Sequence, residues 1–317
     1  MKVYITDRIP EIATTKLEKN KLTVKTFNGS KLITEAELIE EVADADFLIT
    51  ALSTKVDKNI IDHAPKLKLI ANFASGFNNI DTAYARKKGI CVTNTPIVST
   101  TSVAEVTIGL ILSISHRLVE GDQLMRSTGF DGWRPLFFLG HEIAGKNLGI
   151  VGLGNIGKAV ANLAQSFSMN VFYWQPRRLK PEQERVLNLS YLEFDELVKT
   201  SDFISLNSPL TDDNKHQFDQ NVFAQMKDSA YLINAARGPI VDEAALVSAL
   251  KNKEIAGAAL DVYEHEPAVS EELKSMKNVV LTPHLGNATI EARNAMAEVV
   301  VDNVMKVIRG EAVPAVN

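Results

Sequence analysis

The chain has a single cysteine, Cys91, among its 317 residues. One cysteine cannot form an internal disulfide, and this one lies in the strand-like run Ile90–Thr93. A buried thiol in such a run behaves as a small apolar side chain, and no neighbouring residue marks it as a nucleophile. We therefore expect a fold that is held together without disulfides, in a reducing compartment.

A net positive charge, long apolar runs and flexible linkers are also absent. The formal net charge of −5 gives no electrostatic attraction for nucleic acid or for an anionic membrane. No apolar stretch approaches the roughly 20 residues of a membrane helix, and Met1–Thr6 is typical of a strand rather than of a signal peptide. The sequence has no Gly- or Ser-rich linker, repeat or low-complexity tract. These absences favour a soluble, cytoplasmic protein with no membrane, nucleic acid or metal partner.

Strand-like and helix-like segments alternate along the whole chain. Many of the strand candidates are near-continuous apolar runs, which is typical of parallel strands that are covered on both faces. The first four form one βα set and the last six form another, so the sequence predicts an α/β protein with two doubly wound parallel-sheet domains. The candidates are Lys2–Thr6, Ala45–Thr50, Leu67–Phe73, Ile90–Asn94, Leu148–Val151, Val171–Trp174, Phe203–Leu206, Tyr231–Asn234, Ala258–Val262 and Val279–Thr282.

Two helical segments predict the domain boundaries. Ser102–Val119 is long and lies between the two sets of strands, so we interpret it as the crossover. Thr289–Arg309 is a long amphipathic helix that comes too late to belong to the second sheet, and we expect it to return to the first. The predicted domains are therefore a discontinuous substrate domain, residues 1–100 and 287–317, and a dinucleotide-binding domain, residues 101–286.

A glycine-rich turn, Gly152–Gly157, separates the apolar run Leu148–Val151 from the helical segment Lys158–Ser166. Strand, glycine turn and helix in this order are typical of a dinucleotide site. The first glycine makes the tight turn, the second lets the backbone approach a pyrophosphate, and the third lets helix and strand pack closely. Free N–H groups at the start of the helix face the anion. An ordinary βα turn is the alternative.

The next strand lacks an acidic residue at its end. In NAD-binding versions of the turn, an Asp or Glu about 20 residues past the glycines binds the ribose hydroxyls. Here Val171–Trp174 is followed by Gln175, Pro176, Arg177 and Arg178. Two guanidinium groups would pair with a 2′-phosphate, so the sequence favours NADP over NAD. The alternative is that both arginines only solvate a loop and that NAD is bound by other groups.

Polar residues follow several other predicted strands at the edge where open α/β sheets bind ligands. Ser75 and Gly76 could offer backbone N–H groups to a carboxylate, although this segment alone favours a plain strand-ending turn. Arg237 stands between a buried strand and Gly238-Pro239, where its guanidinium suits bidentate carboxylate binding. A surface salt bridge is the alternative for Arg237.

An acidic segment and a histidine follow the last two strands. Leu260–Pro267 supplies several carboxylates, and by itself it is an acidic loop. His284 ends an apolar strand two residues before a glycine, where its ring can project into a cleft. The other histidines lack such a position and are assigned to surface or structural roles: His63, His116, His141, His216 and His265.

The segment Phe130–Phe138 is unusually aromatic for a connector. A loop that packs on the core is one interpretation. An arm that is exchanged between subunits is the other, because exposed aromatic residues at this density are typical of an interface. The second interpretation predicts a homodimer.

Together these segments resemble the D-isomer-specific 2-hydroxyacid dehydrogenases. The resemblance covers essentially the whole chain. Within the family the glyoxylate/hydroxypyruvate reductase branch is the best match, because of Asp131–Leu136 and Gln175–Arg177; Leu285–Asn287 departs from many members. The motifs that carry the resemblance are Gly152–Gly157, Asn234–Pro239, Gly257–Pro267 and Thr282–Thr289.

The resemblance implies the reaction and the roles of particular residues. Arg237 would bind the substrate carboxylate and polarise the carbonyl, and His284 would donate the proton to the carbonyl oxygen. Glu266 would hydrogen-bond the other ring nitrogen of His284 and stabilise the imidazolium. Asp261 would hold the nicotinamide carboxamide. The remaining implied residues are Leu52, Ser75 and Gly76 for the substrate, and Thr107, Gly152, Gly154, Asn155, Ile156, Gly157, Gln175, Arg177, Arg178, Asn207, Ser208, Pro209, Ala235 and Gly286 for the cofactor.

The implied activity is reduction of a small 2-oxoacid by NADPH or NADH. The side-chain pocket would include Leu52, Phe77 and an aromatic residue from Trp133–Phe138. One alternative is a dehydrogenase for another 2-hydroxyacid, including a phosphoglycerate-type enzyme. Another is a nucleotide-sensing binding protein, because transcriptional corepressors share this fold. The set of Arg237, Glu266 and His284 favours turnover over sensing.

Overall fold

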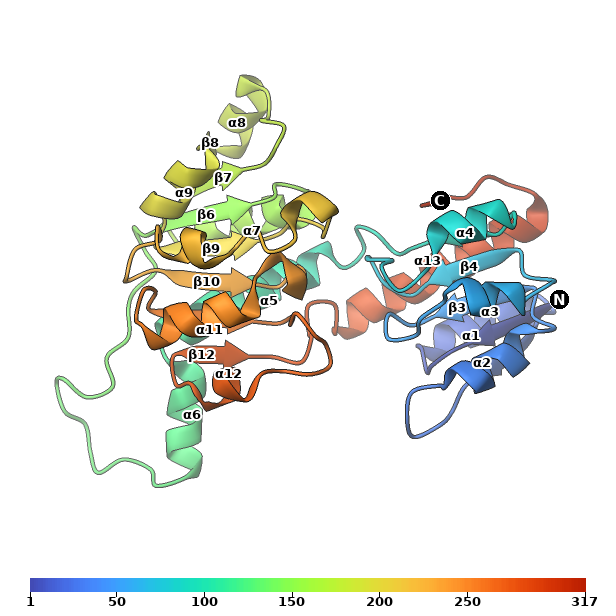
Figure 1. Ribbon diagram of the computed structural model, residues 1–317, viewed down its shortest axis with the longest axis horizontal. Coiled ribbons are helices and arrows are strands. Elements are labelled where there is room, and N and C mark those ends of the chain that lie inside the picture. The colour runs from blue at the N-terminus through green and yellow to red at the C-terminus, as the bar shows by residue number, and fades with distance from the viewer. The chain divides into compact units, whose positions relative to one another are not determined.

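The computed structural model describes residues 1–317, and the chain forms two compact units (Figure 1). Unit 1 consists of Met1–Ser99 and Ala288–Asn317, and unit 2 consists of Thr100–Asn287. Unit 1 is therefore built from both ends of the chain. Both units contain a parallel sheet with helices on its two faces, so the predicted α/β class with two doubly wound sheets is confirmed.

The sheet of unit 1 has five parallel strands in the order β2-β1-β3-β4-β5, which is the flavodoxin-like order. Successive residues along a strand point to opposite faces. Val3 and Ile5 of β1 therefore join one core, whereas Tyr4 joins the other. The strands are β1 (Lys2–Ile5), β2 (Thr23–Thr26), β3 (Phe47–Thr50), β4 (Leu69–Asn72) and β5 (Cys91–Thr93).

The C-terminal helix α13 (Ile290–Arg309) completes one face of this sheet, as the sequence predicts. Its residues Met296, Val300 and Val304 are fully buried in the same cluster as Leu17 of α1 (Glu11–Lys19). Thr289 caps the helix by accepting a hydrogen bond from the Ala292 N–H. The other face is covered by α2 (Glu35–Val42), α3 (Lys58–Asp62) and α4 (Thr82–Lys87).

The sheet of unit 2 has seven parallel strands in the order β12-β11-β10-β9-β6-β7-β8, which is a Rossmann order extended by one strand. The direction of winding reverses between β6 and β9, and ligands bind beside such a switch point. The strands are β6 (Asn147–Val151), β7 (Asn170–Trp174), β8 (Ser190–Tyr191), β9 (Phe203–Leu206), β10 (Tyr231–Asn234), β11 (Gly257–Leu260) and β12 (Val279–Leu281).

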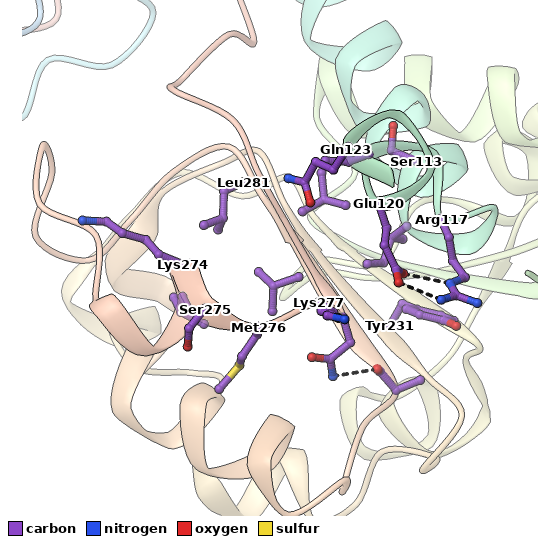
Figure 2. Close-up of a pocket in the computed structure, with 17 residues that line it drawn as sticks. Ser113, Arg117, Glu120, Gln123, Tyr231, Lys274, Ser275, Met276, Lys277 and Leu281 are labelled. Atoms are coloured by element: carbon purple, nitrogen blue, oxygen red, sulfur yellow. Dashed lines mark hydrogen bonds and ion pairs between the residues drawn. The ribbon is translucent and has the colours of Figure 1, made fainter. Parts of the chain in front are cut away.

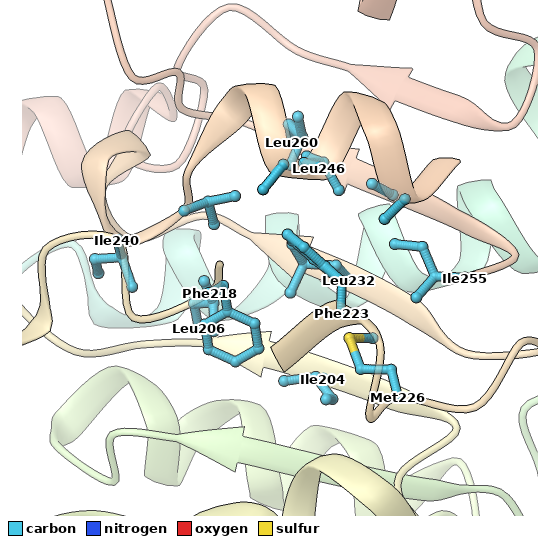
Figure 3. Packing of buried hydrophobic residues seen from close by; sticks show 14 of the residues in the cluster. Ile204, Leu206, Phe218, Phe223, Met226, Leu232, Ile240, Leu246, Ile255 and Leu260 are labelled. Carbon is cyan, nitrogen blue, oxygen red and sulfur yellow. The ribbon is translucent and has the colours of Figure 1, made fainter. Parts of the chain in front are cut away.

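Two buried clusters hold this sheet. The first, drawn in Figure 3, joins the strands to Phe223 of α10 and Leu246 of α11. The second lies against α5 and α7, where Ile111 and Val160 are fully buried. The helical elements of unit 2 are α5 (Thr100–Ser115), α6 (Leu118–Arg126), α7 (Asn155–Ser166), α8 (Pro181–Leu187), α9 (Phe194–Thr200), η1 (Asp212–Asn214), α10 (Gln220–Phe223), η2 (Gly238–Ile240), α11 (Glu243–Lys251) and α12 (Glu271–Ser275).

Two strands, β2 and β8, are absent from the sequence-based prediction of four and six strands. Both lie at the edge of a sheet. Thr23–Thr26 alternates between exposed and half-buried positions, and β8 has only two residues. Neither segment forms the apolar run that marks a strand buried on both faces.

The predicted crossover helix Ser102–Val119 is not continuous. α5 ends at Ser115, and α6 begins at Leu118 after Arg117 adopts a left-handed conformation with φ 56°. The two helices are bent by 65° at this break. No single helix is long and apolar enough to cross a membrane, and α5 with α6 meet that test only as a bent pair.

Candidate active site

The three glycines of the turn after β6 meet three different steric demands. Gly152 has φ +93°, and a Cβ there would lie 2.7 Å from the Ser208 nitrogen. A Cβ at Gly157 would lie 2.2 Å from the Gly152 carbonyl oxygen, whereas one at Gly154 would meet nothing within 4 Å. The first and third glycines therefore close the turn, and the second leaves open space beside the backbone. These are the demands of a turn that admits a pyrophosphate.

The helix that follows presents its first N–H groups without a side-chain cap. α7 begins at Asn155, earlier than the predicted Lys158, and its N-cap residue Gly154 offers no side chain to accept from Ile156 or Gly157. Uncapped N–H groups and the helix dipole attract an anion. The residues present thus fit the pyrophosphate of a dinucleotide.

The end of β7 is bound to the glycine turn. The Gln175 side chain accepts a hydrogen bond from the Leu153 N–H at 3.2 Å and donates one to the Arg177 carbonyl at 2.7 Å. The Gly152 N–H also donates to the Trp174 carbonyl at 2.9 Å. The predicted cofactor residues of both segments therefore lie together in one site.

Arg178 is not free in the way that the sequence suggests. Its guanidinium donates two hydrogen bonds to Glu184, at 2.8 and 2.9 Å, and lies 5.1 Å from the centre of the Tyr191 ring. Tyr173 donates a third hydrogen bond to Glu184, at 2.6 Å. The hydrogen bonds from Arg178 and Tyr173 lower the pKa of Glu184 to about 2. Arg177 is exposed and pairs with no carboxylate in the chain, so it is the guanidinium that is available to a phosphate.

The other predicted cofactor residues lie around the ends of neighbouring strands. Asn207 and Ser208 follow β9, and Ser208 lies against Gly152. Pro209 is exposed, and Ala235 follows β10. Thr107 is fully buried and donates to the Val103 carbonyl at 2.8 Å. A contact between each of these residues and the cofactor stays a prediction.

Asp261 is buried and organises the segment that carries His284. One carboxylate oxygen accepts from the Leu285 N–H at 2.7 Å and from the Thr282 hydroxyl at 2.6 Å. The other accepts from the Gly286 N–H at 2.8 Å. The nicotinamide contact that the resemblance implies for Asp261 stays a prediction, and the structure shows in addition that this carboxylate fixes the turn after β12.

His284 and Glu266 form a hydrogen-bonded pair, with 3.0 Å between Nδ1 and Oε2. About a third of each side chain is exposed, 30% and 35%. His284 has φ 56°, a left-handed conformation that costs energy in a residue with a Cβ and that is typical of functional sites. Burial raises the pKa of Glu266, but the hydrogen bond and charge of His284, the Tyr263 N–H and Arg237 together hold that pKa below its ordinary value. The carboxylate is therefore ionised at neutral pH, and Nε2 of the ring is left for a substrate.

Arg237 is a half-buried cation without an ion pair. Its guanidinium donates one hydrogen bond, to the Ala236 carbonyl at 2.6 Å, and no carboxylate lies within salt-bridge distance. Burial lowers its pKa, while the charge of Glu266 opposes that effect. The remaining N–H groups of Arg237 thus form a site for an anion at the same sheet edge as His284, because β10, β11 and β12 are neighbours.

Unit 1 contains a turn with unpaired donors after β4. The backbone N–H groups of Ser75 and Gly76 have no acceptor in the chain. The turn is held by the Asn72 side chain, which donates to the Gly76 carbonyl at 2.6 Å, and by Asn94, which donates to the Ser75 carbonyl at 2.6 Å. Leu52, in the loop after β3, is half-buried. A fixed turn with two free N–H groups suits a carboxylate.

Two cavities of unit 2 lie at opposite ends of its strands. One of about 320 Å³ is lined by Glu266 and His284. The other, of about 610 Å³, is lined by Tyr231 and Val279, the first residues of β10 and β12 (Figure 2). Because ligands of such sheets bind at the carboxyl ends of the strands, the second cavity is not part of the candidate active site.

This geometry agrees with the comparison with known proteins. Residues 108–286 match the sequence model of the NAD binding domain of D-isomer specific 2-hydroxyacid dehydrogenases. The chain belongs to this family. It is an oxidoreductase of 2-hydroxyacids with a nicotinamide cofactor, and the predicted family resemblance is confirmed.

Relatives of this 2-hydroxyacid dehydrogenase match it over nearly its full length. A Staphylococcus aureus protein named "Putative 2-hydroxyacid dehydrogenase" is 53% identical over 98% of this chain and 97% of its own. The TT0316 protein from Thermus thermophilus is 37% identical, with a TM-score of 0.92 over 99% of both chains. An NADPH-dependent glyoxylate/hydroxypyruvate reductase from Sinorhizobium meliloti, solved with NADP and malonate, is 30% identical, with a TM-score of 0.85 over 99% of this chain and 95% of its own.

Proposed function

We propose that this dehydrogenase reduces a small 2-oxoacid, glyoxylate or hydroxypyruvate, to the 2-hydroxyacid with NADPH. The observation that carries the proposal is the set of groups after β10, β11 and β12: an unpaired guanidinium, an ionised carboxylate and the histidine that it binds. A 2-oxoacid has one anionic group and one polarisable carbonyl. The guanidinium suits the anionic group, and the histidine suits the carbonyl oxygen. Oxidation of NADPH in the presence of glyoxylate tests the proposal.

Arg237 binds the substrate carboxylate and polarises the adjacent carbonyl. Its free N–H groups supply the charge, and its partial burial strengthens the attraction because less water screens it. The free N–H groups of Ser75 and Gly76 in unit 1 suit a carboxylate by themselves, and their role toward the substrate stays a prediction from the family resemblance. The assignment of Leu52 and Phe77, in the loops after β3 and β4, to the side-chain pocket stays a prediction from the family resemblance.

His284 donates the proton to the carbonyl oxygen from Nε2 while the carbonyl carbon accepts a hydride. Glu266 accepts from Nδ1, so it orients the ring and balances the positive charge that the ring carries before the transfer. The reverse reaction uses the same groups with His284 as the base. Gly152–Gly157 would hold the NADPH, which would supply the hydride.

The preference for the smallest 2-oxoacids is supported by the arm segment and by a relative. The sequence Asp131–Leu136 matches the glyoxylate/hydroxypyruvate reductase branch. A solved NADPH-dependent reductase of this kind is similar to the chain over nearly its full length. A cytoplasmic location stays a prediction from the single cysteine.

We predict that Arg177→Ala lowers kcat/KM for NADPH by about 10-fold to 100-fold, the range for a lost charge-assisted hydrogen bond to phosphate. kcat/KM for NADH stays near the wild-type value, because NADH lacks the 2′-phosphate. Steady-state kinetics with both nucleotides measure the effect. Arg185→Ala is the matched control, because Arg185 is an exposed arginine of the following helix that faces Glu182 at 3.5 Å. A wild-type preference for NADH contradicts the NADP assignment.

The proposed assembly is a homodimer that forms through α6 and the arm segment Phe130–Phe138. α6 has no buried residue, and in the arm Trp133 and Leu136 are 82% and 84% exposed. The arm therefore does not pack on the core of its own chain, which removes the first of the two interpretations. Figure 1 shows it as an open loop that extends beyond α6 from the sheet of unit 2. Exposed apolar surface of this kind is typical of an interface. In the proposed homodimer, the arm of each subunit packs on a second copy of the chain.

The replacement of Trp133 and Leu136 together by aspartate is expected to convert a dimer into a monomer, because two charges would be buried without partners. Sedimentation velocity measures the mass of the wild type and of the variant. Val186→Asp is the control, because Val186 is 85% exposed but lies in α8, outside the arm. A monomeric wild type, or a dimer that persists in the double variant, contradicts the proposal.

A further inference from the structure

We propose that His216, Glu264 and Glu243 form a latch that positions Glu266, and that His216 is a positioning residue for the reaction. The inference rests on the proposed function for the role of Glu266. His216 has no apolar strand beside it in the sequence, and the structure places its Nε2 2.6 Å from the Glu264 Oε1, 48 residues further along the chain.

The latch is a closed set of hydrogen bonds around one carboxylate. Glu264 is bound to His216 through one oxygen, and its other oxygen accepts from the Glu243 N–H at 3.1 Å. Glu243 returns the contact, because its carboxylate accepts from the Glu264 N–H at 3.2 Å and from the Ser270 N–H at 3.3 Å. The segment 264–270 is therefore bound at both ends to the first turn of α11.

Glu266 lies inside the segment that the latch holds. Its Oε1 accepts from the Tyr263 N–H at 3.0 Å, and its Oε2 binds His284. One residue, His265, lies between Glu264 and Glu266, and the hydrogen bonds of Glu266 are these two. A shift of the backbone at Glu264 would therefore move the carboxylate that orients His284.

His216 also connects this segment to the turn that carries Arg237. Its own N–H donates to the Pro239 carbonyl at 2.8 Å, and the Phe218 N–H donates to the Ile240 carbonyl at 3.0 Å. Gly238 lies so close to the segment that a Cβ there would be 1.8 Å from the Tyr263 carbonyl oxygen. His216 therefore connects the turn that carries Arg237 to the segment that carries Glu266 by hydrogen bonds.

The electrostatics of the latch favour an ionised Glu264. Burial raises the pKa of this carboxyl, but the Glu243 N–H, the hydrogen bond from His216 and the charges of His216 and His265 hold it below its ordinary value. The Glu264 side chain is 13% exposed, so its carboxylate depends on these partners rather than on water. Loss of His216 removes the one side chain that is hydrogen-bonded to this carboxylate.

Two variants test the latch. His216→Asn removes the ring but tolerates the left-handed backbone at this position, φ 53°. Glu243→Gln retains the size of the side chain and removes the charge that binds two backbone N–H groups. His265→Ala is the matched control, because His265 lies between Glu264 and Glu266 but is exposed and has no side-chain hydrogen bond.

The first readout is hydrogen exchange of the backbone amides of residues 262–270 in the protein without substrate. We expect faster exchange at Tyr263, Glu264 and Ser270 in both variants and wild-type exchange in His265→Ala. This readout does not depend on turnover, so it tests the latch even where no 2-oxoacid is reduced. Wild-type exchange in both variants would overturn the inference.

The second readout is catalytic and separates a positioning role from a general loss of structure. kcat for the 2-oxoacid falls by about 10-fold to 100-fold, as for a small displacement of a catalytic group. The dissociation constant of NADPH is unchanged, and the pH–rate profile moves in the same direction as that of Glu266→Gln. A lower kcat with an unmoved pH–rate profile would contradict a role through Glu266. No turnover by the wild type would instead remove the proposed function and leave the exchange result to decide the latch.

Discussion

Replacement of His284 by alanine is expected to lower kcat for 2-oxoacid reduction by about 10²-fold to 10⁴-fold, the range for a general acid. The ring is the one group of the site that is placed to give a proton, and its Nδ1 is held by Glu266 at 3.0 Å. Alanine leaves the carbonyl oxygen without a donor. The substitution removes no contact in the glycine turn, so the dissociation constant of NADPH stays near the wild-type value. Single-turnover kinetics and fluorescence titration with NADPH measure the two quantities.

His265→Ala is the control for this variant. His265 lies on the same acidic segment and is exposed, so its loss changes the local charge but not the proton donor. A His284→Ala enzyme that retains near-full turnover would assign the proton to another group. A variant that also loses NADPH binding would show that the ring supports the cofactor site instead.

Arg237→Ala is expected to raise KM for the 2-oxoacid and to lower kcat, with a combined loss of about 10²-fold to 10³-fold in kcat/KM. Hydrogen bonds between charged groups contribute about 1.5–3 kcal/mol each, and the guanidinium forms more than one with a carboxylate. Both constants change because Arg237 binds the carboxylate in the ground state and polarises the carbonyl in the transition state.

Arg237→Lys separates charge from geometry. Lysine retains the positive charge but not the planar pair of donors, so KM recovers in part while kcat stays low. NADPH binding is unchanged in both variants. Equal effects on NADPH and on the 2-oxoacid would show that Arg237 supports the fold of the turn before Gly238, and the assignment to the substrate carboxylate would then fail.

Features that depend on neighbouring residues in the sequence were predictable. The apolar runs predict ten of the strands because a parallel strand covered on both faces must be apolar throughout. The glycine turn is predictable because Gly152 and Gly157 meet steric demands that belong to the turn itself. The return of α13 to unit 1 follows from its position after the last strand.

Features that depend on contacts between distant residues were not predictable. Thr23–Thr26 becomes a strand only because β1 offers it an edge. The helix predicted over Ser102–Val119 breaks where Arg117 turns left-handed, and its residues give no signal of that break.

The candidate site shows the same division. From the sequence, Arg178 is predicted to be free for a phosphate. In the structure, Glu184 of α8 accepts two hydrogen bonds from its guanidinium. The residues next to His216 in the sequence do not indicate its hydrogen bond, because its partner Glu264 belongs to another loop. Arg237, Glu266 and His284 could be proposed from the sequence because each follows a recognisable strand in the order of the family, and their catalytic roles stay predictions.

The oxidation of NADPH and NADH by the wild-type protein, measured against a panel of 2-oxoacids, is the most direct test of the central claim. The groups after β10, β11 and β12 predict turnover of glyoxylate or hydroxypyruvate with NADPH, with kcat in the range of about 1–10³ s⁻¹ that is usual for enzymes. Tight binding of NADPH without turnover of any 2-oxoacid would contradict the claim and would indicate a nucleotide-sensing protein.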